Sequence, residues 1–139
     1  MKKRILLLVF ILGANKIFSQ SLHLYGGEDH NVYLGCLNCS SYDSDSIWNQ
    51  YGAYGNSYSS MSLWNEYGNY GSNYSSTSPW NNYASYPPIV VDKEGNFYGY
   101  FTINGYKGNR ANFRLALILY GNYERIRQDV SGWYEKIFE

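Results

Sequence analysis

The sequence predicts an α+β fold in a single small domain spanning residues 20–139, and three observations support this. Residues 20–41 and 89–104 each contain two short β-branched or aromatic runs separated by turn residues, which is typical of β-hairpins. Residues 42–88 repeat an aromatic pattern every 16 residues. Residues 112–138 carry apolar side chains at three- and four-residue spacing, which predicts an amphipathic C-terminal helix.

Residues 1–19 have the layout of a secretory signal peptide. Lys2, Lys3 and Arg4 precede an apolar run of ten residues, and Ser19 is the expected last residue before cleavage. The apolar run is shorter than the roughly 20 residues that a membrane-spanning helix needs, although an uncleaved anchor is the alternative. We therefore expect an exported protein, located in the periplasm, at the cell surface or in the medium, with no membrane span after cleavage.

The N-terminal part of the domain, residues 20–41, combines a hairpin with a C-x-x-C motif. The stretches "SLHLY" and "NVYLG" are expected strands, joined through "GGEDH". Shifting the chain by 16 residues places Cys36 on Gly52 and Cys39 on Gly55. We therefore interpret "CLNC" as a degenerate unit that caps the repeats, which would then number three or four.

The repeats read "YDSDSIWNQYGAYGNS", "YSSMSLWNEYGNYGSN" and "YSSTSPWNNYASYPPI", starting at Tyr42, Tyr58 and Tyr74. Ser46 and its equivalents are suitable helix N-caps, and glycine follows where a short helix would end. We expect one helical turn per unit, followed by a turn and a short extended piece. Stacked units would bury their tryptophans and leave their tyrosines partly exposed, whereas the Gly-, Ser- and Asn-rich composition also allows disorder.

The remaining elements are more conventional. "PPIVVDKEGNFYGYFTING" predicts a second β-hairpin, with Gly95 in the turn. The apolar residues from Leu115 to Ile137 predict the C-terminal helix, and Gly121 and Gly132 are potential breaks in it.

Several of these stretches resemble a set of small exported bacterial proteins of unknown function. The resemblance rests on "YLGCLNC", on the S-[ILP]-W-N-x-Y-G-x-Y-G repeats and on the "VVDKEGNFYGYFT" hairpin, and it covers residues 24–104. It implies a similar architecture and a bacterial origin, but no chemistry.

The two cysteines leave three interpretations open. An exported chain meets oxidising conditions, which favours a disulfide between Cys36 and Cys39. His23 and His30 lie upstream, so these four side chains could instead hold zinc, the only cofactor that the sequence suggests. A redox pair would need a helix directly after the motif to lower a thiol pKa, and "SSYDSDS" does not predict one.

The distribution of charge and the lack of a catalytic motif exclude some classes of function. Without residues 1–19 the chain carries 7 basic and 11 acidic residues, and none of the basic ones lies between Lys16 and Lys93. Nucleic acid is therefore not an expected partner. No catalytic set is apparent, which favours a non-catalytic structural or binding module. If the module binds a glycan or another envelope protein, the candidate contact residues are Trp48, Trp64, Trp80, Tyr54 and Tyr70.

Overall fold

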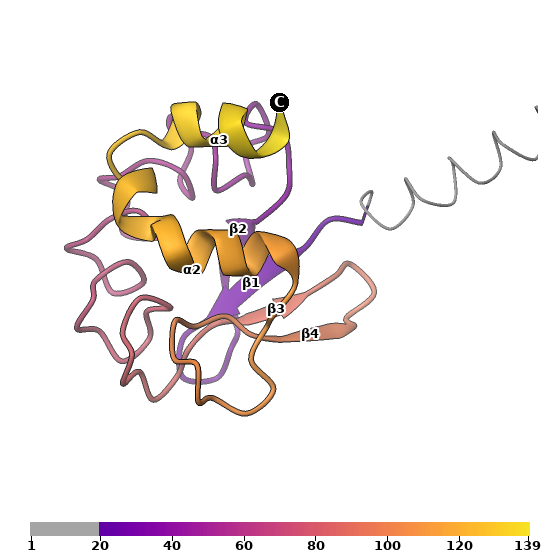
Figure 1. Cartoon of the computed structure of the whole chain (residues 1–139), viewed down its shortest axis with the longest axis vertical. Helices are drawn as coiled ribbons and strands as arrows, with labels where there is room; N and C mark the ends of the chain where they lie inside the picture. The colour runs from indigo at the N-terminus through magenta and orange to yellow at the C-terminus, as the bar shows by residue number, and fades with distance from the viewer. Residues whose placement is uncertain (1–19) are drawn as a thin grey trace, which may run out of the picture.

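A computed structural model describes residues 20–139, so the predicted signal peptide lies outside the described residues. The described part is an α+β fold with a four-stranded antiparallel sheet and two C-terminal helices (Figure 1). Among these residues no helix is long and apolar enough to cross a membrane.

The sheet joins the two predicted hairpins. It contains β1 (His23–Gly26), β2 (Val32–Cys36), β3 (Ile89–Val91) and β4 (Phe97–Tyr100), in the order β2-β1-β3-β4. The hairpins meet because β1 pairs with β3, with Leu24 opposite Val90. Side chains alternate along the strands, so Leu24, Leu34 and Val90 are buried on one face. The other face carries His23, Tyr25 and Tyr33 and remains partly open.

Residues 42–88 follow a different course from the predicted one. They contain no helix. Their backbone makes successive turns, most of which are closed by a bond from about every third N–H to the carbonyl three residues back. The asparagine after each tryptophan accounts for this: Asn65 Oδ1 accepts from the Tyr67 N–H, and Asn65 Nδ2 donates to the Ser59 carbonyl. Both bonds recur at Asn49 and Asn81. The predicted helical turn in each unit was therefore wrong, because the asparagine side chain closes a turn instead.

The serine two residues before each tryptophan does make the bond expected of a cap. Ser46 Oγ accepts from the Trp48 N–H at 3.0 Å, and Ser62 and Ser78 accept from Trp64 and Trp80 in the same way. The three serines are fully buried. They stabilise turns rather than helix ends.

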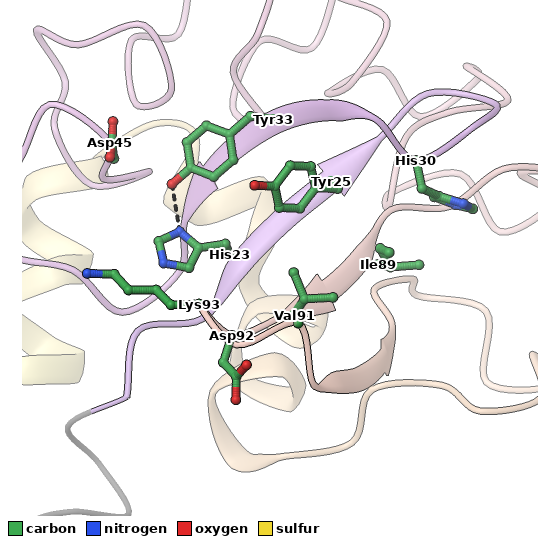
Figure 2. A pocket seen from close by; sticks show the side chains of 10 residues that line it. His23, Tyr25, His30, Tyr33, Asp45, Ile89, Val91, Asp92 and Lys93 are labelled. Carbon is green, nitrogen blue, oxygen red and sulfur yellow. Dashed lines mark hydrogen bonds between the residues drawn. The ribbon is translucent and has the colours of Figure 1, made fainter.

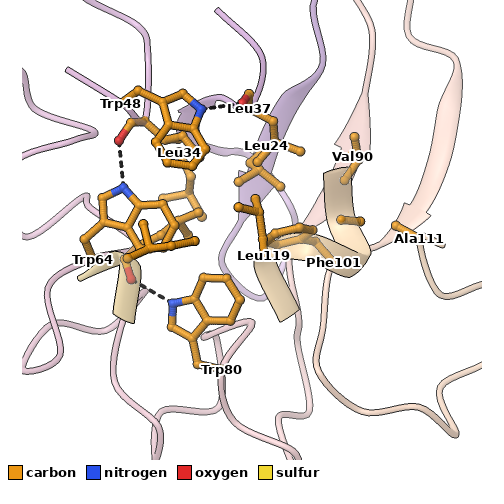
Figure 3. Close-up of a cluster of buried hydrophobic side chains, with 14 of the residues drawn as sticks. Leu24, Leu34, Leu37, Trp48, Trp64, Trp80, Val90, Phe101, Ala111 and Leu119 are labelled. Carbon is orange, nitrogen blue, oxygen red and sulfur yellow. Dashed lines mark hydrogen bonds between the residues drawn. The ribbon is translucent and has the colours of Figure 1, made fainter. Parts of the chain in front are cut away.

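The core of this region is a column of three indoles, Trp48, Trp64 and Trp80, which we call the tryptophan ladder (Figure 3). Each side chain is 1% exposed. Successive ring centroids are 5.6 and 5.9 Å apart. Each indole Nε1–H donates at 2.7 Å to a backbone carbonyl of the preceding layer, and the acceptors are Leu37, Ile47 and Leu63. Burial of the ring and pairing of its polar atom are thus achieved together.

Both ends of the ladder are closed by the C-terminal part of the chain. Trp80 stacks on Tyr123 with centroids 4.6 Å apart, and the Pro79 carbonyl accepts from the Ile103 N–H. At the other end, Trp48 contacts the rings of Tyr134 and Phe138. The Ile103 N–H therefore donates to the Pro79 carbonyl, which in a further repeat would accept from the next indole.

The C-terminal helix predicted over residues 112–138 is two helices, α2 (Arg114–Ile126) and α3 (Val130–Phe138). Gly121 lies inside α2 and Gly132 inside α3, so neither glycine marks the break. The break falls directly before Val130, where the Asp129 side chain accepts from the Gly132 N–H as the N-cap of α3.

Cys36 and Cys39 form a disulfide with their Cα atoms 5.6 Å apart. Cys36 forms a parallel bridge with Ser46, and its neighbour Leu37 supplies the acceptor for Trp48, as Ile47 does for Trp64. Leu37 is therefore the structural equivalent of Ile47, and the predicted alignment of Cys36 with Gly52 by a 16-residue shift is wrong. The loop that carries the disulfide is instead a shortened first layer of the ladder.

Candidate functional site

The residues that the sequence suggested for ligand binding are largely enclosed. The indoles of Trp48, Trp64 and Trp80 offer almost no accessible surface to a ligand, because each residue is only 1% exposed. Tyr54 is half-buried with its ring edge-on to Tyr33, and Tyr70 packs against the hydrophobic core. The binding hypothesis therefore needs other aromatic side chains.

The structure provides six such tyrosines, which sequence reasoning did not single out. They are 88–93% exposed, and two come from each 16-residue unit: Tyr42, Tyr51, Tyr58, Tyr67, Tyr74 and Tyr83. We call them the exposed tyrosines. Nothing in the repeat pattern separates them from Tyr54 and Tyr70, because all occur at the same period. The orientation of each ring follows from the asparagine and serine turns, which are visible only in the structure.

One cavity lies directly beside two of these rings. It has a volume of 490 Å³, and its lining includes Tyr58, Tyr67 and the nearly buried Trp64 of the central unit. Glu66 comes from the same unit, and Glu124, Arg127 and Gln128 come from the end of α2 and the turn after it. We call this the Arg127 cavity. It combines aromatic faces with both acidic and basic groups.

A second, larger hollow of 730 Å³ lies on the outer face of the sheet (Figure 2). His23 Nδ1 shares a 2.7 Å hydrogen bond with the Tyr33 hydroxyl, and its Nε2 lies 2.9 Å from Ser21 Oγ. Burial, and then the charge of Lys93, lower the pKa of His23, while burial raises the pKa of Tyr33. Both side chains are therefore neutral at pH 7, and their polar atoms already have partners.

The zinc alternative fails on geometry. His23 and His30 lie at opposite ends of this hollow, and His30 Nε2 donates to the Pro87 carbonyl (Figure 2). Cys36 and Cys39 are bonded to each other. Among residues 20–139, no three His, Cys, Asp or Glu side chains gather into a possible metal site. The four predicted ligands are thus not brought together.

The redox alternative lacks its structural basis as well. Cys36 is fully buried, and the residues after Cys39 form turns rather than a helix that could lower a thiol pKa. The disulfide instead sits beside Asn38, which accepts from the Leu22 N–H and donates to the Gln20 carbonyl. The loop therefore holds the start of the described chain.

Asp92 in the β3–β4 turn gives a testable pH dependence. Hydrogen bonds from Asn96, and further ones from Tyr98 and Glu94, hold the pKa of Asp92 at about 2, below its usual 3.8. A folded-state pKa below the unfolded one means that this stabilisation is present above about pH 4 and is lost as the pH falls towards 2. We expect Asp92→Asn to lower the Tm near neutral pH, and this difference to shrink towards pH 2. A difference in Tm that stays constant over that range would contradict the assignment.

In comparisons with family models, with curated proteins and with solved structures, no match to this chain was found.

Proposed function

We propose that the chain is an exported, non-catalytic binding module that holds a glycan polymer against its exposed tyrosines. The observation that carries the proposal is that each unit buries its tryptophan and exposes two of its tyrosines. The tryptophan ladder is 1% exposed, whereas two tyrosines per unit are 88–93% exposed. Exposed aromatic groups that gather on one segment of a soluble protein are typical of interaction surfaces.

Tyrosine suits this role for physical reasons. Its ring offers a large rigid contact face at a low cost in conformational entropy, and its hydroxyl can donate and accept hydrogen bonds. A sugar ring offers the matching features, with C–H groups on its faces and hydroxyls at its edge. The repeats contain no lysine or arginine, so a polyanion such as nucleic acid is a poor alternative.

A repeating surface favours a repeating ligand. Each unit presents its two tyrosines from the same positions, so a polymer can contact several units at once. Weak contacts then add through effective concentration, and the polymer binds far more tightly than one sugar does.

Export remains part of the proposal. It is supported by the layout of residues 1–19 and by the Cys36–Cys39 disulfide, which is consistent with an oxidising compartment.

The test is a glycan array probed with the wild-type chain and with a variant carrying Tyr42→Ala, Tyr58→Ala and Tyr74→Ala. We expect the wild type to bind polymeric glycans and the variant to lose at least about tenfold in affinity, which is about 1.4 kcal/mol. The control is Tyr106→Ala, because Tyr106 is 99% exposed but lies outside the repeats. An array without any bound glycan, or equal binding by the triple variant and the control, would reject the proposal.

A further inference from the structure

The Arg127 cavity is lined by an arginine that is largely buried and only partly hydrogen-bonded. The Arg127 side chain is 11% exposed, and burial lowers its pKa. Its Nη2 donates to the Gly71 carbonyl at 2.5 Å and to Asn73 Oδ1 at 2.8 Å. Its Nε is buried and has no hydrogen-bond partner among residues 20–139. An unpaired buried donor on a charged group costs free energy, which offsets part of the stabilisation that the two Nη2 bonds provide.

The guanidinium is nevertheless fixed in place. Nη2 ties it to the turn at residues 71–73, and its plane lies over the Tyr123 ring with the two centres 5.2 Å apart. Nη1 lies 3.7 Å from Glu66 Oε2, which is beyond hydrogen-bond distance. Nη1 is therefore a fixed donor at the cavity that has an ion-pair partner in Glu66 but no acceptor within hydrogen-bond distance among residues 20–139.

The other polar side chains of the cavity either accept hydrogen bonds or can both donate and accept them. Glu66 has its side chain 54% exposed, and its only charged partner among the described residues is the distant Nη1. Glu124 accepts one long bond of 3.3 Å from the Tyr123 hydroxyl. Gln128 adds an amide that can donate and accept. Carboxylates beside a guanidinium suit hydroxyl groups, because each hydroxyl can donate to the former and accept from the latter.

On these grounds we infer that the Arg127 cavity is the principal sugar subsite and that it takes an uncharged sugar of a neutral polysaccharide. The inference rests on the proposed function. Tyr58 and Tyr67 provide the aromatic faces, while Arg127, Glu66 and Glu124 hydrogen-bond the hydroxyls. The volume of 490 Å³ lies within the range of small-ligand sites, about 300–1,000 Å³.

The charge of the cavity selects against charged sugars. Two carboxylates face one guanidinium, so a uronic acid would meet a net negative site. An ammonium group of a cationic amino sugar could donate to these carboxylates, but it cannot accept from Nη1 and its charge would repel the nearby guanidinium. The neutral sugar is the class that satisfies donors and acceptors together.

The other polar hollow offers a weaker site. On the sheet face, both ring nitrogens of His23 have partners, and Asp92 already accepts bonds from Asn96, Glu94 and Tyr98. Asp45, Lys93 and Tyr25 also line that hollow, but none of the six exposed tyrosines does, so it lies apart from the proposed aromatic surface.

The experiment measures binding of four soluble polymers by affinity electrophoresis: a neutral β-glucan, a neutral mannan, a polyuronate and a polyglucosamine. The variant Glu66→Gln/Glu124→Gln removes both charges and keeps the side-chain shape, because glutamine has the size and shape of glutamate. Both side chains are exposed, so we expect the variant to fold. We expect the wild type to bind a neutral polymer at least about tenfold more tightly than either charged one, and the variant to lose about tenfold in that affinity. The matched control is Glu94→Gln/Glu135→Gln, which makes the same charge change outside the cavity.

Three outcomes decide between the ideas. Wild-type chain that binds none of the four polymers overturns the proposed function. The subsite alone is overturned if the Glu66→Gln/Glu124→Gln variant binds a neutral polymer as tightly as the wild type does. It is also overturned if the wild type prefers a charged polymer. Loss of neutral-polymer binding in the variant, with binding and Tm retained in the control, supports the subsite.

Discussion

Trp64→Ala is expected to destabilise the folded chain by about 3–5 kcal/mol, the usual cost of removing a large aromatic side chain from a core. Trp64 is the middle rung of the ladder, with Trp48 and Trp80 on its two sides. Its removal leaves a cavity between them and deprives the Ile47 carbonyl of its donor. Urea unfolding followed by circular dichroism measures the change.

Two companion variants separate the contributions. Trp64→Phe keeps most of the apolar area but loses the indole N–H, so it is expected to cost about 1–3 kcal/mol through the unpaired Ile47 carbonyl. Tyr67→Ala removes an aromatic ring from the same unit that is 90% exposed, so its effect should stay within about 0.5 kcal/mol. Equal costs for Trp64→Ala and Tyr67→Ala would contradict the assignment of buried and exposed rings.

Gly71→Ala is expected to destabilise the chain by at least about 2 kcal/mol, because the new methyl group has no room. A Cβ at this position would lie 2.7 Å from the Asn65 carbonyl carbon and 2.8 Å from the Leu63 carbonyl oxygen. Both are backbone atoms, and the Leu63 oxygen is the acceptor for the Trp80 indole. The turn can only open by disturbing the ladder, and thermal unfolding will report this as a lower Tm.

Gly105→Ala is the matched control for this variant. A Cβ at Gly105 meets nothing within 4 Å, and its backbone lies outside the left-handed region, as does that of Gly71. We expect a change within about 0.5 kcal/mol. Similar losses of Tm for the two glycines would mean that the close approach at Gly71 does not constrain the fold.

The hairpins were predictable because their signals are local. Alternating residues mark β1 and β2, and Gly95, whose φ is 85°, occupies the turn between β3 and β4 as predicted. The pairing of Leu24 with Val90 was not predictable, because no local pattern indicates which strands meet across the repeats. The merged four-stranded sheet was therefore visible only in the structure.

In the repeats the period was readable but the local conformation was not. Ser62 and its equivalents predicted a bond to a backbone N–H, and this bond exists. The following Asn65 was not recognised as a turn-forming residue, although its side chain makes two backbone bonds. A short segment with both a capping serine and such an asparagine adopts turns because side-chain bonds compete with helical ones.

The candidate site was only partly predictable for a related reason. Aromatic periodicity identified the segment, but exposure distinguishes Tyr67 from Tyr70, which lies three residues further along and packs on the core. Arg127 was beyond reach of the sequence pattern, because its partners Gly71 and Asn73 are more than 50 residues away.

The tryptophan ladder fills the core of the repeats, and the turns between its rungs carry the exposed tyrosines. Its most direct test is hydrogen exchange of the four tryptophan indole N–H groups by NMR. Trp48, Trp64 and Trp80 donate to buried carbonyls, whereas the indole of half-buried Trp133 has no acceptor among residues 20–139. We predict that three indole protons exchange slowly and that the Trp133 proton exchanges fast. Fast exchange of all four would contradict the ladder.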